Sequence, residues 1–300
     1  MNNFLTRLAS GVVVATLIIA GILASRISYG LVVLIAAIGG VYEFYTISTP
    51  IRHADESQNK KDRRTAVILT FIAIFLSWLL NFRHTLADLA ILLPAILFFF
   101  FVRELFRKTE TPFQNIAWDI LPFVYIVVPV MMLNYLYFDK GAMFALGILF
   151  LIWFYDSMCY ICGSLFGRTK LFERISPKKT VEGLVGGMVF SLIFVFFYDK
   201  IFVFLGTKYP SSNWFSVWTY SNIQWLIIGF FTLVFATLGD LVESQLKRNI
   251  GIKDSGSILP GHGGFLDRLD AILVALPFTV LTVFVLDRVN DILLILDFLK

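Results

Sequence analysis

The sequence predicts an all-α, polytopic membrane protein with about nine transmembrane helices. Of its 300 residues, 58% are hydrophobic and only 15% are charged, a balance far from that of soluble globular domains. Apolar runs of about 20 residues, the length a helix needs to cross a bilayer, recur along the whole chain. The polar segments between them are too short to form a soluble domain of ordinary size.

Nine apolar ranges form the predicted spans, near residues 8–25, 28–49, 65–82, 85–106, 115–138, 142–165, 183–205, 222–246 and 269–287. The first could be a signal peptide with Arg7 as its basic flank, but another apolar range follows at once, so we expect an uncleaved anchor. Most Lys and Arg residues share one side with the N-terminus, which predicts a cytoplasmic N-terminus and an outside C-terminus. The two most polar loops, 166–182 and 247–268, then face the cytoplasm.

Two parts of the chain differ in their polar content. Unusual polar residues concentrate after residue 140, so we expect residues 1–140 to form a transmembrane scaffold and residues 141–300 to form the catalytic part. The basic residues lie next to the spans, where orientation and anionic lipid account for them, and they do not indicate nucleic-acid binding. Cys159 and Cys162 are too few for a disulfide framework or a four-ligand zinc site, and we interpret them as packing residues.

Carboxylates inside predicted membrane helices mark a candidate site, because charge is costly there. One face of the span at 222–246 carries a polar stripe formed by Asp240, Glu243, Ser244 and Lys247. Asp267 and Asp270 open the next span. These acids could form a structural ion-pair network with basic neighbours. They could also hold Mg²⁺, which takes one or two carboxylates together with substrate phosphates.

A basic, Gly-rich loop joins these two acidic segments. Gly263 and Gly264 would let the backbone approach a ligand closely and point N–H groups at it. The basic residues that could pair with phosphate oxygens are Lys247, Arg248 and Lys253. His262 has no second histidine nearby, which is more typical of a hydrogen-bonding or structural residue than of a general base.

A second polar cluster, SPKKT, precedes the span at 183–205. Ser176 and Thr180 can cap or hydrogen-bond, and Lys178 and Lys179 place two cations before a helix start, which suits an anionic ligand. Ordinary positive-inside charge would also account for the two lysines. The upstream run GSLFGRTK has three residues between its glycines where a phosphate-binding P-loop has four, so we reject a P-loop.

Both clusters together resemble the phosphatidate cytidylyltransferases, also called CDP-diacylglycerol synthases. The resemblance is carried by SQLKRNIGIKDSGSILPGHGGFLDRLD at 244–270, by SPKKTVEGLVGG and by 156–160. At Cys159 the family often shows Ala. Residues before about 100 match the family in hydropathy and little else. The resemblance implies an enzyme that condenses CTP with phosphatidic acid to CDP-diacylglycerol and pyrophosphate, dependent on Mg²⁺, with room for a second cation.

The resemblance also implies roles for individual residues and an assembly. Asp240 and Asp267 would be metal ligands, with Asp270 close by. Nucleotide contacts would come from Lys178, Lys179 and Thr180, with Ser176, His262, Gly263 and Gly264 in the same set. We assign contacts with the lipid phosphate or pyrophosphate to Lys247, Arg248 and Arg268. The family forms homodimers whose protomers have a polar cavity open to the cytoplasm and the lipid, and residues 1–140 are expected to hold the dimer contacts.

Other functions stay open on the sequence. Another CTP-dependent lipid enzyme, such as a polyprenol kinase or an archaeol cytidylyltransferase, would differ in its product. An ion-coupled transporter would also use intramembrane acids, but transporters commonly show paired repeats in both halves, and here the polar residues concentrate in one. An inactive scaffold could keep the motif. The short N-terminus indicates a bacterial inner (cytoplasmic) membrane, with the active site facing the cytoplasm.

Overall fold

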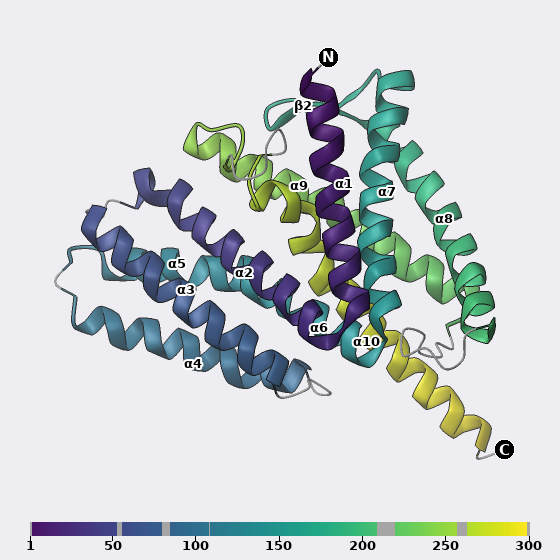
Figure 1. Cartoon of the computed structure of the whole chain (residues 1–300), viewed down its shortest axis with the longest axis horizontal. Helices are drawn as coiled ribbons and strands as arrows, with labels where there is room; N and C mark the ends of the chain where they lie inside the picture. Colours follow the sequence, from purple (N-terminus) through teal and green to yellow (C-terminus); the bar gives the residue numbers. More distant parts are fainter. Residues whose placement is uncertain are drawn as a thin grey trace.

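The chain folds into long helices joined by short connections, as a computed structural model shows (Figure 1). The structure describes residues 2–52, 56–79, 85–107, 109–208, 220–256 and 263–298. The helices are α1 (Asn2–Ala24), α2 (Arg26–Ser48), α3 (Glu56–Leu79), α4 (Thr85–Leu105), α5 (Pro112–Pro122), α6 (Val128–Asp139), α7 (Ala142–Phe166), α8 (Val181–Lys208), α9 (Asn222–Ile250) and α10 (Leu266–Phe298). Two short strands, β1 (Lys170–Phe172) and β2 (Ser176–Thr180), form an antiparallel hairpin between α7 and α8.

Every predicted span overlaps helical structure, which confirms an all-α, polytopic membrane protein. Within the described residues, six helical segments are long and apolar enough to cross a membrane: Arg26–Ser48, Pro112–Asp139, Ala142–Phe166, Val181–Tyr198, Asn222–Ile250 and Leu266–Leu293. The apolar part of α1, Gly11–Ala24, is shorter, and α3 opens with the charged run ESQNKKDRR. The count of nine spans stays a prediction.

The span predicted at 115–138 is not one regular helix. α5 ends at Pro122, α6 has Pro129 near its start, and a π-helical turn, Phe123–Val127, joins them. A proline ring removes one N–H donor and clashes with the carbonyl of the preceding turn, so a regular α-helix is disfavoured here. The π turn accommodates one extra residue. It therefore sets the rotation of α6 relative to α5.

Two buried polar networks hold this span against its neighbours. Asp119 on α5 is fully buried and accepts a 2.6 Å hydrogen bond from Arg52, which follows α2. Two further arginines lie within ion-pair distance of the same carboxylate. On α6, Asn134 accepts a 2.7 Å hydrogen bond from the Tyr29 hydroxyl and donates one of 2.7 Å to Ser77. Buried polar groups need such partners, so both networks fix which faces meet.

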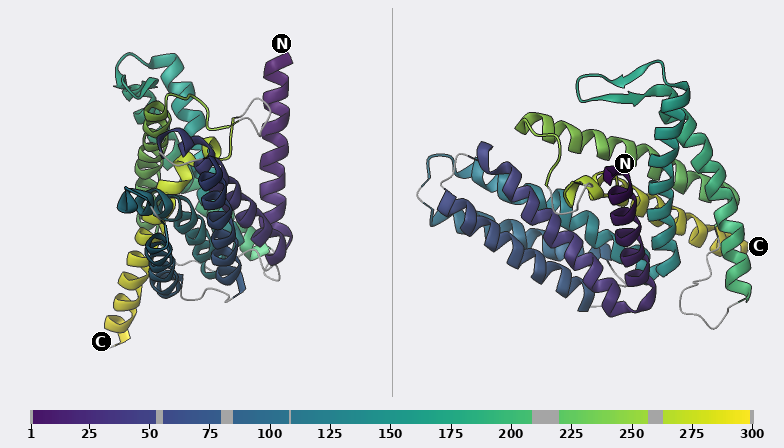
Figure 2. Two further views of the ribbon diagram at one scale, coloured as in Figure 1. Left: turned by 90° about the vertical axis from the view of Figure 1, so that its left-hand side faces the viewer. Right: turned by 45° about the horizontal axis from the view of Figure 1, so that its top comes forward.

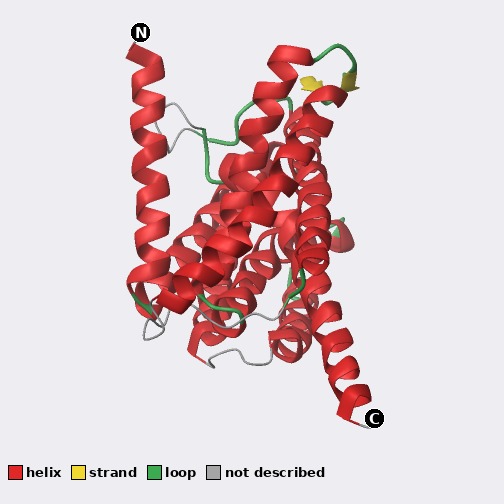
Figure 3. Ribbon diagram, turned by 90° about the vertical axis from the view of Figure 1, so that its right-hand side faces the viewer, coloured by secondary structure: helices red, strands yellow, loops and turns green. Residues whose placement is uncertain are grey.

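The helices form two groups with α10 against both. Helices α2 to α5 gather in one group, whereas α7 packs along α8 and α9 packs along α10 (Figures 1 and 2). Helix α1 stands at the side of the bundle and contacts mainly α2 and α7 (Figure 3). The N-terminus and the hairpin lie toward one end of the molecule, and the C-terminus lies at the other.

The two cysteines lie where α7 and α8 approach closely. Both are free. A Cβ added at Gly187 would collide with Cys159, and one added at Gly186 would collide with Cys162. Small residues let helices in a membrane approach to van der Waals contact. The sulfur atoms thus fill the space that the glycines leave, as expected of packing residues.

Candidate active site

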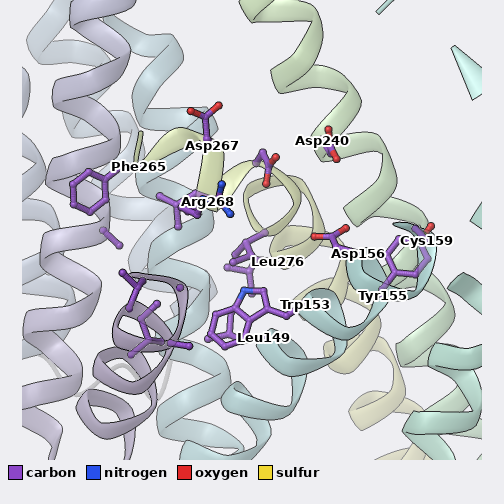
Figure 4. Close-up of a pocket in the computed structure, with 18 of the residues that line it drawn as sticks. Leu149, Trp153, Tyr155, Asp156, Cys159, Asp240, Phe265, Asp267, Arg268 and Leu276 are labelled. Atoms are coloured by element: carbon purple, nitrogen blue, oxygen red, sulfur yellow. The ribbon is translucent and has the colours of Figure 1, made fainter. Parts of the chain in front are cut away.

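A cavity of about 930 Å³ lies between α1, α2, α7, the hairpin, α9 and α10. Its polar wall is formed by Asp156, Lys178, Lys179, Thr180, Asp240, Asp267, Arg268 and Asp270. Its apolar wall comes largely from α1 and α2 and includes Val14, Leu17, Ile18, Ile22, Val32, Val33 and Ile35. Figure 4 shows carboxylates from α7, α9 and α10 around one space. The cavity therefore offers charge on one side and a hydrocarbon-like surface on the other.

The α9 side of the cavity carries the predicted polar stripe. Helix α9 starts in a capping box, in which the Ser221 side chain accepts from the backbone of Gln224. It ends at Ile250 and is followed by Gly251, whose φ of 80° favours glycine. On this helix, Ser244 donates a 3.2 Å hydrogen bond to Asp240. Lys179 from the hairpin forms an ion pair with the same carboxylate. The structure thus joins the two polar clusters of the sequence at Asp240.

Lys178 and Lys179 of the hairpin line the cavity, and hydrogen bonds at the start of α8 hold the hairpin in place. Glu182, in the first turn of α8, accepts hydrogen bonds from the backbone N–H groups of Arg168 (3.0 Å) and Thr169 (3.1 Å). The Thr180 hydroxyl accepts from Gly183 at 3.2 Å and so caps α8. The segment SPKKT is therefore a strand that leads directly into the helix. Ser176, at its far end, is not among the cavity-lining residues.

Asp267 is the most heavily bonded of the predicted acids. Its carboxylate accepts hydrogen bonds from the backbone N–H of Ser255 (2.8 Å) and of Gly264 (2.9 Å), and from the Lys247 ammonium (2.6 Å). Gly263 has a φ of 82°, and a Cβ there would collide with the same carboxylate. In this structure the Gly264 N–H is donated to Asp267, and both glycines make room for side chains. His262 lies outside the described residues.

Of the remaining predicted residues, two line the cavity and two do not. Arg268 and Asp270 line the cavity, and the Asp270 carboxylate accepts from the N–H of Ala271 at 2.7 Å. Lys247 is not among the cavity-lining residues, and besides Asp267 it pairs with Glu243 at 2.5 Å. Arg248 is exposed and donates a 3.1 Å hydrogen bond to the carbonyl of Ile252 at the end of α9. It is not among the cavity-lining residues.

Two acids at the site were given no role from the sequence. Asp156 on α7 lines the cavity. Glu43 on α2 is 3% exposed and accepts hydrogen bonds from the Ser255 hydroxyl (2.8 Å) and the Leu266 N–H (2.7 Å). Asp156 is a charge inside a predicted span and belongs to the segment 156–160 that carries the resemblance. Glu43 is also a charge inside a predicted span, and that costly placement is the signal that could have marked it.

Asp240 and Asp267 are the residues of the polar wall that could hold a magnesium ion, if a phosphorylated substrate supplied further ligands. In the described part of the chain, no three His, Cys, Asp or Glu side chains form a group that could hold a metal alone. Asp240 and Asp267 instead face one cavity from neighbouring helices, and each already binds a lysine ammonium. Mg²⁺ is typically held by one or two carboxylates, with water and substrate phosphates completing its shell.

The fold and the cavity define a polytopic membrane protein with a cavity that is charged on one wall and apolar on the other. Residues 5–286 match the model of the cytidylyltransferase family. The chain belongs to that family and is a nucleotidyltransferase.

Proteins from several bacteria are similar to this chain. A phosphatidate cytidylyltransferase of Thermotoga maritima is 29% identical over 289 residues, covering 96% of this chain and 99% of that protein. One from Staphylococcus saprophyticus is 38% identical over 172 residues, 57% of this chain and 60% of that protein. One from Bacillus subtilis is 44% identical over 127 residues, 42% of each chain.

Proposed function

We propose that this protein transfers CMP from CTP to phosphatidic acid in phospholipid biosynthesis, forming CDP-diacylglycerol and pyrophosphate. The observation that carries the proposal is the two-sided cavity. Its polar wall suits the phosphates of both substrates, and its apolar wall on α1 and α2 suits the acyl chains. The family membership and the names of the similar proteins support the same reaction.

The reaction asks for charge neutralisation and alignment more than for a strong base. The lipid phosphate is already ionised near neutral pH, so one of its oxygens can attack the α-phosphorus of CTP directly. The new P–O bond forms while the bond to the β-phosphate breaks, and the electron pair leaves with pyrophosphate. Two anions must therefore be held in line, with their charge offset by the site.

The acids and lysines of the polar wall meet these demands. Asp240 and Asp267 would hold Mg²⁺, with Asp270 beside them, and the bound ion would offset charge on the phosphate oxygens. Lys179 lines the cavity and forms an ion pair with Asp240. Because its ammonium lies at the cavity surface, it can also bind a phosphate of the nucleotide. Arg268 lies on the same wall and suits the lipid phosphate or the leaving pyrophosphate.

We place the protein in the bacterial inner membrane as a homodimer, with nine spans, a cytoplasmic N-terminus and an active site that faces the cytoplasm. Positive-inside charge supports this orientation. In this proposal residues 1–140 contain the dimer contacts, and residues 141–300 carry most of the polar wall.

Transfer of labelled CMP from CTP to phosphatidic acid by the purified, detergent-solubilised protein tests the proposal. We expect product formation that needs Mg²⁺, stops on chelation, and falls by at least about 100-fold in Asp240→Asn and in Asp267→Asn. Asp291→Asn, which changes an exposed acid of α10, should keep full activity. Lipid phosphorylation with release of CDP would instead assign a kinase. Transfer only to an archaeal-type ether lipid would change the substrate.

A further inference from the structure

One face of α2 packs against the segment that carries Asp267. A Cβ added at Gly39 would collide with the ring of Phe265. One residue further, Gly40 faces Leu269 at ordinary van der Waals distance. Both partners flank Asp267 in sequence. Helix α2 therefore approaches the start of α10 closely, and the lack of a side chain at Gly39 makes the approach possible.

Glu43, one turn further along α2, makes the polar contacts between this helix and the segment that carries Asp267. One of its oxygens, Oε2, accepts both the Ser255 hydroxyl at 2.8 Å and the Leu266 N–H at 2.7 Å. Gly256 and Gly264 leave the space that the carboxylate fills, because a Cβ at either position would collide with it. Glu43 thus contacts the loop on both sides of the Asp267 site.

The Ser255 hydroxyl lies between two carboxylates. Its Oγ is 2.8 Å from Glu43 and 3.0 Å from Asp267. A serine hydroxyl has one proton to donate. Glu43 is the nearer acceptor and so competes with Asp267 for that proton, and the Ser255 oxygen in turn accepts the Asp267 N–H at 3.3 Å. With that proton on Glu43, the Asp267 carboxylate accepts three hydrogen bonds rather than four.

We propose that Glu43 is a positioning residue for Asp267. It fixes the turn before α10 through Leu266 and Ser255, and it keeps the Ser255 proton away from the carboxylate that would hold the cation. Outer-shell partners of metal-binding carboxylates act in this way, by orienting the ligand and tuning its basicity. The inference rests on the proposed role of Asp267 and deepens it.

Loss of the Glu43 side chain has two expected consequences at this turn. Leu266 is fully buried, so its N–H would lose its acceptor where water cannot replace it. The Ser255 hydroxyl would turn to Asp267 and weaken that carboxylate as a ligand. A residue with only a packing role would lower stability without changing how much Mg²⁺ the enzyme needs.

The test compares Glu43→Ala and Glu43→Gln with Glu104→Ala in the full-length, detergent-solubilised protein. Glu104 is a matched control, because it is also a buried glutamate of the first 140 residues and bonds Asn115 at 2.8 Å, on another helix pair. The readouts are the Mg²⁺ concentration for half-maximal CMP transfer, the unfolding temperature, and amide hydrogen exchange of peptides that contain Leu266.

We expect Glu43→Ala to raise the Mg²⁺ requirement by about 10–100-fold and to speed exchange at Leu266. Glu43→Gln keeps an oxygen acceptor, so its Mg²⁺ requirement should stay within about threefold of the parent protein. Glu104→Ala should lower the unfolding temperature and leave the Mg²⁺ requirement unchanged.

An unchanged Mg²⁺ requirement in Glu43→Ala, or the same rise in Glu104→Ala, would overturn the proposal. So would unchanged exchange at Leu266 in Glu43→Ala. Asp267→Asn separates this failure from failure of the proposed function: if that variant keeps full activity, the metal role of Asp267 is wrong. If it is inactive while Glu43→Ala behaves as the parent, only the positioning role is wrong.

Discussion

Lys247 forms ion pairs with two poorly exposed carboxylates, so its replacement by methionine should destabilise the protein strongly. Its ammonium lies 2.5 Å from Glu243 and 2.6 Å from Asp267. The side chains of the three residues are 12%, 1% and 9% exposed, in that order. Lys247→Met keeps most of the apolar stem and removes the charge, which leaves two acids without their shared cation.

The expected magnitude follows from these distances. At an effective dielectric constant of about 20, each contact attracts by roughly 6 kcal/mol before desolvation is counted. Desolvation offsets much of that attraction, and removal of one partner from a buried pair typically costs about 3–5 kcal/mol. For 300 residues, an unfolding entropy of about 0.6 kcal/mol per kelvin converts this cost into a fall of roughly 5–8 °C.

Thermal unfolding of the purified protein in detergent measures the effect. Lys60→Met is the matched control, because Lys60 pairs with Glu56 at 2.8 Å while 64% exposed. Exposed pairs on one helix contribute about 0.3–0.5 kcal/mol, so this control should shift the midpoint by less than about 1 °C. Adding Glu243→Gln to Lys247→Met removes one uncompensated charge and should recover about 2 kcal/mol, or about 3 °C.

Two results would refute this reasoning. If Lys247→Met unfolds as close to the parent as Lys60→Met does, the two carboxylates are not dependent on the ammonium. If Glu243→Gln destabilises the Lys247→Met protein as much as it destabilises the parent, the two residues are not coupled.

Three further substitutions probe other contacts. Lys179→Met should lower kcat/KM for CTP by about 10–100-fold, with little change in unfolding temperature because Lys179 and Asp240 keep 31% and 23% of their side chains exposed; an unchanged kcat/KM would exclude the nucleotide contact. Gly39→Val drives a side chain into the Phe265 ring and should lower turnover about tenfold. Adding Phe265→Ala should restore part of the turnover, and a double variant with no recovery would show that the clash lies elsewhere. Asp119→Ala should destabilise by about 3–5 kcal/mol in thermal unfolding yet leave turnover of the folded enzyme unchanged at low temperature, whereas reduced turnover would connect this network to the site.

The features predicted well from the sequence are those that depend on local spacing. Long apolar runs must become helices in a bilayer, because only internal hydrogen bonds can satisfy their backbone. The stripe from Asp240 to Lys247 followed from helical periodicity alone. In the structure, Ser244 donates a hydrogen bond to Asp240, and Glu243 forms an ion pair with Lys247. The position of Asp267 and Asp270 at a helix start likewise predicted that they face the same site, and both line the cavity in the structure.

Contacts between distant segments could not be predicted in this way. Glu43 and Ser255 are separated by 212 positions, and nothing in the spacing of one sequence links them. The same limit hid the apolar wall of α1 and α2. The hairpin was missed because its strands are short and flank one turn, so no alternating pattern of useful length exists.

Arg248 illustrates a different limit. A cation in the last turn of a helix can bind a phosphate or bond the carbonyl groups at the helix end, and both roles favour the same residue type at the same position. The structure places Arg248 against the Ile252 carbonyl. Only the three-dimensional path of the chain after Gly251 separates these two roles.

The π turn between α5 and α6 has a consequence for how this chain can vary. Each residue of an α-helix advances the rotation by about 100°. A one-residue deletion within Phe123–Val127 would therefore turn α6 by about that angle against α5. Asn134 could then no longer meet Tyr29 while Asp119 still met Arg52. The length of this turn is therefore fixed by two anchors, one before it on α5 and one after it on α6.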